Sequence, residues 1–403
     1  MRFLSRLCLA IALLCPLLVP HGALAGVLPS GPNAQVTDPE LRSEDGTDPS
    51  LAISGTTLYA AWLDTRFTKS SIYHEIFFAR SEDGGMTWSA NKDVSSDRYD
   101  GYADAYIHQP SISVAPNGDI YIVWGLESCN YPRPDTACDG GGLANDVRLA
   151  RSTDGGATFA EYRVFDGLDS FDDVEQAPQV IAANDRAYVL YGSITAAGDG
   201  FDIYLRTVTP SAGGLSAAAP VKISAGVGNG RDSSSSGLSQ FPRITMAVAG
   251  DRVCAAWEDR RSGGAGGRFW IYGACSADRG QTFGPNVPIT GDDDYMPKLA
   301  FAPSGALYLA YQDAPQRDVL IRASPDGGGS WGGPLQATSI DSGLKIFDFA
   351  LATDANGQLL LAAPLNEYRE SDLYLYSSID GGRSFAAYGP VQDGQGTYPT
   401  VAT

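Results

Sequence analysis

The chain has 403 residues, 43% of them hydrophobic, and a formal net charge of −19 at pH 7. Nucleic acid and anionic membrane surfaces are poor partners for so acidic a chain, because like charges repel. The acidity instead favours solubility outside the cell.

The first 25 residues have the pattern of an export signal. Arg2 and Arg6 precede an apolar run over 7–19, and Ala23-Leu-Ala25 fits a small-residue cleavage site. The run is shorter than a membrane-spanning helix needs, and no later segment approaches that length. We therefore expect residues 1–25 to be a signal peptide, no membrane span, and a mature chain of residues 26–403 that is secreted or periplasmic. Removing the two arginines takes the net charge from −19 to −21.

Beyond the signal peptide, a pattern of four short strands recurs. One strand opens just after a proline, as in Pro110-Ser-Ile-Ser-Val, and a tight turn leads to a second strand that ends in an aromatic residue, as over 120–124. A third strand follows a loop of variable length, and a short fourth strand completes the unit. Six units begin near these residues: Asp48, Gln109, Ala177, Phe241, Met296 and Phe347.

Five of the six units join their third and fourth strands by the same corner, Ser-x-Asp-x-Gly-x-Thr/Ser-Trp/Phe. The corners are 81–88, 152–159, 276–283, 324–331 and 378–385, and the third unit has lost its corner. In each, the Asp carboxylate can accept backbone N–H bonds within the turn, the Gly supplies a positive φ, and the aromatic ring packs onto the core. The recurrence of so specific a turn indicates a repeated supersecondary unit.

Apolar and polar residues alternate through these units, and nothing has the period of a helix. Four antiparallel strands make a twisted sheet that cannot bury both faces alone, so neighbouring sheets must stack on it. We expect an all-β fold, a six-bladed β-propeller of four-stranded antiparallel sheets that forms one domain over residues 26–403. Seven blades are the alternative, because 34–37 and 398–402 read as strands outside the six units.

Four of the six cysteines remain after the signal peptide. Cys129 and Cys138 flank one loop, whereas Cys254 and Cys275 fall on neighbouring strands of the fourth unit. An even number of cysteines in an exported protein predicts two disulfides, Cys129–Cys138 and Cys254–Cys275. A metal site on these cysteines is the weaker interpretation, since no histidine accompanies them.

The five corners resemble the Asp-boxes, or bacterial neuraminidase repeats, of the sialidase superfamily. The resemblance covers essentially the whole mature chain through Trp88, Phe159, Phe283, Trp331 and Phe385 and their turns. It implies that the corners are structural and lie on the side of the propeller opposite the active site. Function is then expected at the other rim, in the links between units and the loops between second and third strands. These segments are rich in carboxylates, tyrosines and arginines, which suit a carbohydrate or glycoprotein ligand.

Sialidases share three arginines that grip the ligand carboxylate, an Asp acid/base, and a Tyr nucleophile assisted by a Glu. Their first arginine stands in a Phe/Tyr-Arg-Ile-Pro stretch before the first blade, and that stretch is absent from this sequence. Other residues can fill these roles by their position. The candidate catalytic residues are Arg66, Arg243, Arg260, Arg369, Asp64, Tyr295 and Glu258. Tyr368 and Tyr398 are alternatives to Tyr295 as nucleophile, and Glu175 and Glu367 are alternatives to Glu258 as its partner.

Each candidate also has a structural interpretation. Asp64 with Arg66, and Asp259 with Arg260, can be local ion pairs that cap a strand end. Arg243 follows a strand-opening proline and can simply line a watery channel. The tyrosines can be packing residues with hydrated hydroxyls.

The resemblance implies an exported glycoside hydrolase of exo-α-sialidase type, acting on terminal sialic acid or a related acidic sugar. The alternative is a non-catalytic propeller that binds glycan or protein through the same rim. A lyase or hydrolase for another polysaccharide is a third reading. No cofactor is required, although Asp oxygens in the acidic links make calcium the metal to consider. A monomer is expected.

Overall fold

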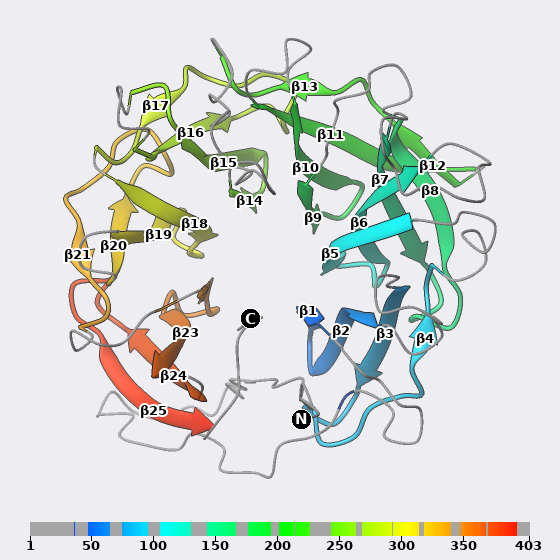
Figure 1. The fold of residues 1–403 in the computed structure, drawn as a ribbon, viewed down its shortest axis with the longest axis horizontal. Helices are drawn as coiled ribbons and strands as arrows, with labels where there is room; N and C mark the ends of the chain where they lie inside the picture. Colours follow the sequence, from blue (N-terminus) through cyan, green and yellow to red (C-terminus); the bar gives the residue numbers. More distant parts are fainter. Residues whose placement is uncertain are drawn as a thin grey trace.

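The computed structural model describes residues 36, 47–64, 75–95, 105–129, 143–166, 176–194, 201–212, 214–225, 243–262, 268–291, 293–313, 318–339, 346, 348–367 and 370–392. Their strands form six antiparallel sheets that stand around a common axis as the blades of a β-propeller (Figure 1). The described residues contain no helix, and so none that is long and apolar enough to cross a membrane. The six-bladed all-β prediction is confirmed.

The first three blades contain these strands: β1 (Thr47–Ser54), β2 (Thr57–Asp64), β3 (Glu75–Ser81), β4 (Lys92–Asp93), β5 (Ala105–Val114), β6 (Ile120–Cys129), β7 (Leu143–Ser152), β8 (Ala160–Asp166), β9 (Gln176–Ala182), β10 (Ala187–Ile194), β11 (Phe201–Ser211), β12 (Gly214–Ala217) and β13 (Val221–Lys222). The last three contain these: β14 (Ile244–Ala249), β15 (Arg252–Asp259), β16 (Trp270–Ser276), β17 (Val287–Pro288), β18 (Asp294–Phe301), β19 (Leu307–Asp313), β20 (Val319–Ser324), β21 (Leu335–Gln336), β22 (Ala350–Thr353), β23 (Leu359–Glu367), β24 (Glu370–Ser378) and β25 (Ala386–Gln392).

Each blade is built outward from its first strand. β1, β5, β9, β14, β18 and β22 lie nearest the axis, and the later strands follow in chain order (Figure 1). The third blade differs, because β12 and β13 both pair with β11 and the β11–β12 hairpin stands where the other blades have a corner. The expected loss of the third corner is thus confirmed.

Antiparallel pairing sorts the connections onto two rims. The turns between first and second strands share one rim with the corners, and we call it the corner rim. The loops between second and third strands, and the links from one blade to the next, share the opposite rim, which we call the loop rim. The rim expected to carry function is therefore separated from the corners by the length of the strands.

The five corners share one set of hydrogen bonds. The Ser hydroxyl donates to Asp Oδ1 at 2.6–2.8 Å and accepts the N–H of the Gly at 2.6–2.8 Å. The Asp carboxylate also accepts the N–H of the Thr or Ser at 2.9–3.0 Å and its hydroxyl at 2.6–2.7 Å. The Gly has a φ of 78–106°, a region that a Cβ disfavours. Each corner therefore satisfies its own polar groups.

These hydrogen bonds make the corners sensitive to acid. The Thr87 donors lower the pKa of Asp83 from 3.8 to about 2, and the Ser384 hydroxyl lowers the pKa of Asp380 likewise to about 2. Since the folded pKa is the lower one, the unfolded chain takes up these protons first as the pH falls. The corner carboxylates therefore contribute to the free energy of unfolding in full above about pH 4, and we expect this contribution to be lost progressively as the pH falls towards 2. Urea unfolding across this pH range measures the loss.

Asp83→Asn provides the control for this prediction. The amide keeps the shape of the corner but removes one titrating group, so the decline between pH 4 and pH 2 should be shallower than in the unsubstituted protein. Identical pH profiles for the two proteins would contradict the assignment.

Four innermost strands contain a bulge at the proline where the sequence pattern places their start. The register of β1 jumps from Thr47 to Ser50, and that of β18 jumps from Tyr295 to Lys298. β5 and β9 have the same irregularity. Proline has no N–H for the ladder, and a bulge is one way in which a strand accommodates it. These strands thus begin before the proline, which corrects the predicted boundary.

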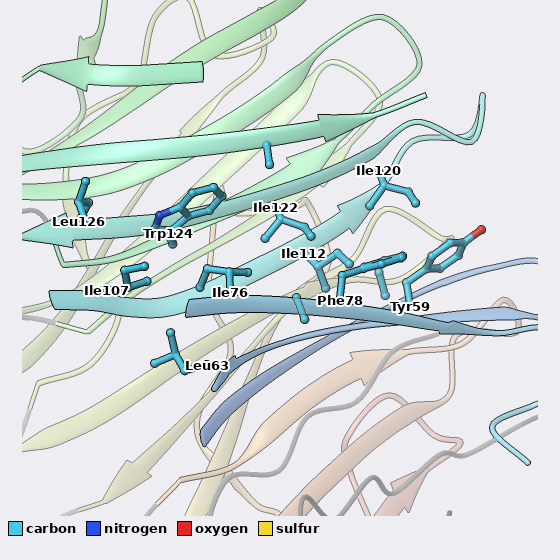
Figure 2. Close-up of a cluster of buried hydrophobic side chains, with 13 residues drawn as sticks. Tyr59, Leu63, Ile76, Phe78, Ile107, Ile112, Ile120, Ile122, Trp124 and Leu126 are labelled. Carbon is cyan, nitrogen blue, oxygen red and sulfur yellow. The ribbon is translucent and has the colours of Figure 1, made fainter. Parts of the chain in front are cut away.

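Apolar side chains fill the junctions between blades. Figure 2 shows the first junction, where Tyr59, Ile76 and Phe78 of the first blade face Ile112 and Ile120 of the second. Alternate residues of the same strands face the other neighbour, so each sheet is buried on both sides. This packing holds the strand ends of adjacent blades side by side at both rims.

Of the two predicted disulfides, Cys254–Cys275 is confirmed and joins β15 to β16. Cys129 ends β6, and Cys138 lies outside the described residues. The pair Cys129–Cys138 therefore stays a prediction.

Candidate functional site

Four of the seven candidate residues meet at the loop rim of the fourth and fifth blades. Glu258 and Arg260 stand at the end of β15, Arg243 directly precedes β14, and Tyr295 lies at the start of β18. The strands run antiparallel, so all these chain ends emerge at the same rim. The charges of Glu258 and Arg260 both act on the Tyr295 hydroxyl.

A stack of three side chains forms the centre of this junction. The Arg260 guanidinium carbon lies 4.1 Å from the centroid of the Phe269 ring, and that ring meets Tyr295 edge-on at 5.3 Å between centroids. Phe269 is buried, so the cation–π contact is shielded from water on one side. The stack holds a cation and a phenol next to each other. Phe269 carries no signal in the sequence pattern that would single it out.

The Tyr295 hydroxyl is paired with a carboxylate. It donates to Asp293 Oδ1 at 2.7 Å, and the same oxygen accepts the N–H of Phe269 at 3.2 Å. Burial, followed by the hydrogen bond to Asp293, raises the pKa of Tyr295 well above its ordinary value. At neutral pH the phenol is therefore protonated, and Asp293 is the group placed to receive its proton. Sequence reasoning had named Glu258 for that role.

Glu258 is a buried carboxylate that joins two blades. Its Oε1 accepts the N–H of Met296 at 2.8 Å, and its Oε2 accepts the N–H of Arg243 at 3.1 Å. Burial raises the pKa of Glu258, while the Met296 N–H and the charge of Arg243 oppose the rise. Met296 lies in the bulge of β18 with a φ of 58°, and its N–H points across the junction to Glu258. The described hydrogen bonds of Glu258 thus serve the backbone rather than Tyr295.

Two cations stand on the innermost strands of this junction. The Arg243 side chain is exposed and makes no hydrogen bond or ion pair with the described residues. Lys298 of β18 occupies the equivalent place in the fifth blade, and its Nζ lies 3.3 Å from Asp348 Oδ1. In the first and second blades this place holds Ser50 and Ser111, whose hydroxyls accept N–H groups of the next blade. In the fourth and fifth blades a cation occupies this place near the axis, and the equivalent link between these two blades is made by Thr245, whose hydroxyl accepts the Leu299 N–H at 3.1 Å.

The two Trp-x-Asp segments have a structural role. Trp62 Nε1 donates to Asp64, and Trp257 Nε1 donates to Asp259, each at 3.0 Å. Asp259 pairs with Arg261, whose Nε donates to it at 2.7 Å, so the interpretation that paired Asp259 with Arg260 is wrong. Counted from the tryptophan, Arg261 is also the true equivalent of Arg66. This offset could have been read from the sequence.

Of the three remaining candidates, only Asp64 lies among the described residues, and it does not join the junction. Asp64 is fully buried in the first blade, which the sixth blade separates from the fifth (Figure 1). Arg66 and Arg369 lie outside the described residues. Within the described ranges no three His, Cys, Asp or Glu groups are placed to hold a metal ion. The described residues therefore provide no carboxylate cluster for calcium.

The junction offers two kinds of chemistry. Arg243 and Lys298 provide positive charge for an anionic ligand, and guanidinium forks suit carboxylates in particular. Tyr295 and Asp293 provide a phenol and a base within hydrogen-bond distance of each other. The exposed Arg243 and the half-buried Tyr295 lie on the same rim.

No family model and no curated protein sequence matches the chain. Among solved structures, a PL25 ulvan lyase bound to -[GlcA(1-4)Rha3S]- is 12% identical over 87% of this chain and 85% of its own, with a TM-score of 0.58. The NanB sialidase from Streptococcus pneumoniae is 9% identical over 80% of this chain, which spans 65% of NanB, with a TM-score of 0.52. An intramolecular trans-sialidase from Ruminococcus gnavus is 11% identical over 86% of this chain and 96% of its own, with a TM-score of 0.51. At these identities the likeness shows a propeller fold that carbohydrate-active proteins also have.

Proposed function

We propose that this chain is an exported, sialidase-like propeller that binds an acidic sugar at the loop rim of its fourth and fifth blades. The reaction is hydrolysis of the bond to a terminal sialic acid or a related acidic sugar. The hydrogen bond from Tyr295 to Asp293, beside Arg243 and Arg260, carries this proposal. The corners that resemble Asp-boxes, and neighbours that include sialidases and a polysaccharide lyase, support the choice of a glycan. The Cys254–Cys275 disulfide agrees with an oxidising compartment.

The side chains of the junction suggest a division of labour. Arg243 receives the sugar carboxylate, with Lys298 near it on the next blade. Tyr295 attacks the anomeric carbon while its proton passes to Asp293, as in glycosidases that use a tyrosine nucleophile. The glycosidic C–O bond breaks and the leaving oxygen takes a proton from solvent, after which water hydrolyses the tyrosine–sugar bond and returns the proton to the phenol. Arg260 stabilises the negative charge that develops on the phenol. Arg66 and Arg369 remain the candidates for the rest of the carboxylate clamp.

A binding protein without turnover is the second candidate, and two observations favour it. Tyr295 has a raised pKa, which makes its hydroxyl a weak nucleophile until a base takes the proton. The described hydrogen bonds of Glu258 are used by backbone N–H groups of the two blades. A glycan would then be held by the cations and the aromatic rings alone.

One experiment separates the two candidates. The purified exported protein is tested on a fluorogenic sialoside and on a uronic acid disaccharide, and in parallel on a glycan array. Turnover of the sialoside supports hydrolysis, whereas retention on acidic glycans without turnover supports binding alone. An unsaturated product from the uronic acid substrate would instead identify a lyase. A protein that shows neither turnover of these substrates nor retention on acidic glycans would overturn the proposal.

Arg243→Ala tests the binding half of the proposal. Loss of a charged hydrogen-bond donor is expected to weaken binding of an acidic glycan by about 10- to 100-fold, with a smaller dependence on salt. The matched control is Arg383→Ala, which removes an exposed arginine from the corner rim. Equal effects of the two substitutions in a calorimetric titration would refute a site at Arg243.

A further inference from the structure

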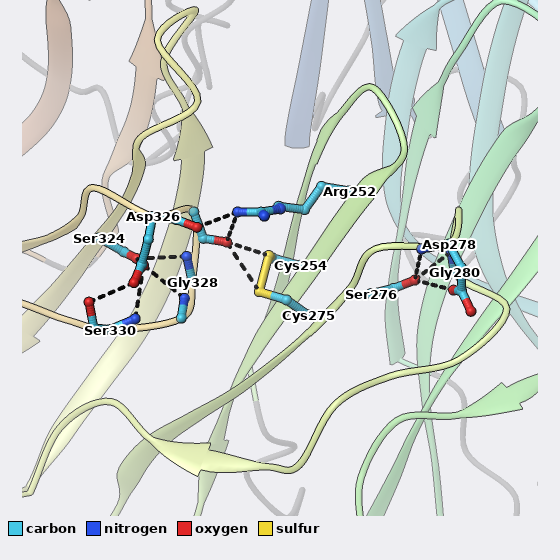
Figure 3. Close-up of a disulfide and its surroundings, with 12 residues drawn as sticks. Arg252, Cys254, Cys275, Ser276, Asp278, Gly280, Ser324, Asp326, Gly328 and Ser330 are labelled. Carbon is cyan, nitrogen blue, oxygen red and sulfur yellow. Dashed lines mark hydrogen bonds between the residues drawn. A yellow bond between two sulfur atoms is a disulfide. The ribbon is translucent and has the colours of Figure 1, made fainter.

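A cavity of about 290 Å³ lies between the fourth and fifth blades at the corner rim, away from the site described above. It is lined by Gly273 and Leu299, by Trp331 of the corner of the fifth blade, and by Arg252. Both cysteines of the disulfide also form part of its wall. Figure 3 shows the disulfide, which joins β15 to β16 of the fourth blade, beside this corner.

The cavity follows from a departure of the fourth blade from the repeat. Three residues before the corner serine the other boxed blades have Phe78, Leu149, Ile321 and Leu375, and the fourth blade has Gly273. Phe78 and Ile321 contact the second glycine of the next corner. In the fourth blade the sulfur of Cys275 takes that place, since a Cβ on Gly328 would clash with it. The disulfide, together with Ile289, whose Cδ1 lies 2.7 Å from where a Cβ on Gly273 would stand, thus takes the place of a large apolar side chain beside the cavity.

The two cysteines differ in their access to this space. Cys254 is 1% exposed, whereas Cys275 is partly exposed. Gly327 O lies 3.6 Å from Cys254 Sγ and 3.8 Å from Cys275 Sγ, so it can accept a bond from a thiol on either residue. Because Cys275 is the more exposed of the two, an incoming nucleophile meets Cys275 first and Cys254 becomes the leaving group.

The cavity also favours a thiolate. Arg252 donates from Nη1 to the carbonyls of Asp326 and Gly327, which fixes its positive charge at the wall. The nearby Asp326 carboxylate is already occupied by hydrogen bonds from Ser324 and Ser330. A positive charge at the wall of the cavity raises the thiolate fraction of a thiol that enters it, and the thiolate is the reactive form.

We infer that this cavity is a modification site, at which a low-molecular-weight thiol exchanges with the Cys254–Cys275 disulfide and becomes attached to Cys275. The thiolate sulfur attacks Cys275 Sγ and forms a new S–S bond. The bond between Cys254 and Cys275 breaks, its electron pair goes to Cys254 Sγ, and that sulfur takes a proton from solvent. A second thiol can release the adduct, leaving two cysteine thiols and one small-molecule disulfide.

The first test uses the folded full chain and thiols of graded size. The protein is incubated with free cysteine or with a polyethylene glycol thiol of several kilodaltons, quenched by alkylation, and mapped by mass spectrometry. Cysteine is expected to appear on Cys275 at least about tenfold more often than on Cys254, and the large thiol to react at least about tenfold more slowly relative to its rate with the unfolded chain. Equal adducts on the two residues, or no adduct until urea unfolds the protein, would overturn the inference.

A matched pair of variants provides the second test. Cys254→Ser and Cys275→Ser both remove the disulfide, so they share its loss of stability. With oxidised glutathione under native conditions, Cys275 in the first variant is expected to react at least about tenfold faster than Cys254 in the second. Equal rates, or the opposite order, would show that the cavity does not control access. Peptide mapping separates these adducts from any on Cys129 or Cys138.

Discussion

Tyr295→Phe is expected to abolish most of the sialoside turnover while leaving glycan binding largely intact. The substitution keeps the ring that packs on Phe269 but removes the hydroxyl that donates to Asp293. Loss of a group that takes part in bond making or proton transfer typically costs about 10²–10⁴-fold in rate. A fall in kcat of at least about 100-fold with little change in KM is the expected result.

Tyr308→Phe is the matched control, because Tyr308 belongs to the same blade and its hydroxyl lies close to the corner glycine Gly381 at the opposite rim. Its activity should stay within about twofold of the unsubstituted protein. Asp293→Asn should resemble Tyr295→Phe, since the amide accepts the hydroxyl hydrogen bond but not the proton. Full activity of Tyr295→Phe would exclude Tyr295 as the nucleophile, and equal losses in Tyr308→Phe would indicate a general effect on folding.

Glu258→Ala is expected to destabilise the folded protein by about 2–4 kcal/mol, because it leaves the buried N–H of Met296 and the partly buried N–H of Arg243 without an acceptor. Each unsatisfied buried donor costs about 1–3 kcal/mol, and the lost side chain adds a small void. Urea unfolding at pH 7 measures the change. Glu82→Ala, an exposed corner residue, is the control and should shift stability by less than about 0.5 kcal/mol.

Glu258→Gln separates the structural role from a chemical one. The amide has nearly the same shape but offers only one acceptor, so one of the two backbone donors faces an N–H₂ group. We expect an intermediate loss of stability, with turnover falling only as far as folding does. A variant that is as stable as the unsubstituted protein yet inactive would show that the carboxylate acts on the substrate.

The corners and strands could be predicted because their information is local. Asp83 is bonded to Ser81 and Thr87, within a few residues of chain, and the same spacing recurs in four more corners. The order of residues along β15 likewise indicates which side chains project from each face of the sheet, because successive side chains point to opposite faces. The strand starts were misplaced because a proline suggests a boundary, whereas Met296-Pro297 is absorbed in a bulge.

The candidate site was predicted only in outline. The sequence pointed to the loop rim and to Tyr295, Arg243 and Arg260, which lie at one junction in the structure. It did not reveal Asp293 as the partner of Tyr295, or Phe269 as the ring between Arg260 and Tyr295, because Phe269 comes from a different blade than Tyr295. It also could not show that Glu258 faces Met296, since Leu63 at the same position of the first blade is simply part of the core.

Sequence alone therefore determined the repeat, its all-β character, the six units and the disulfide between Cys254 and Cys275. All of these depend on contacts between residues close in the chain or on neighbouring strands of one sheet. Only the tertiary structure decided which side chains meet between blades: the Tyr295–Asp293 pair beside Arg260, the buried Glu258, and the cavity next to Gly273. These depend on the packing of one sheet against the next, and residues of similar spacing acquire different neighbours at each junction of the ring.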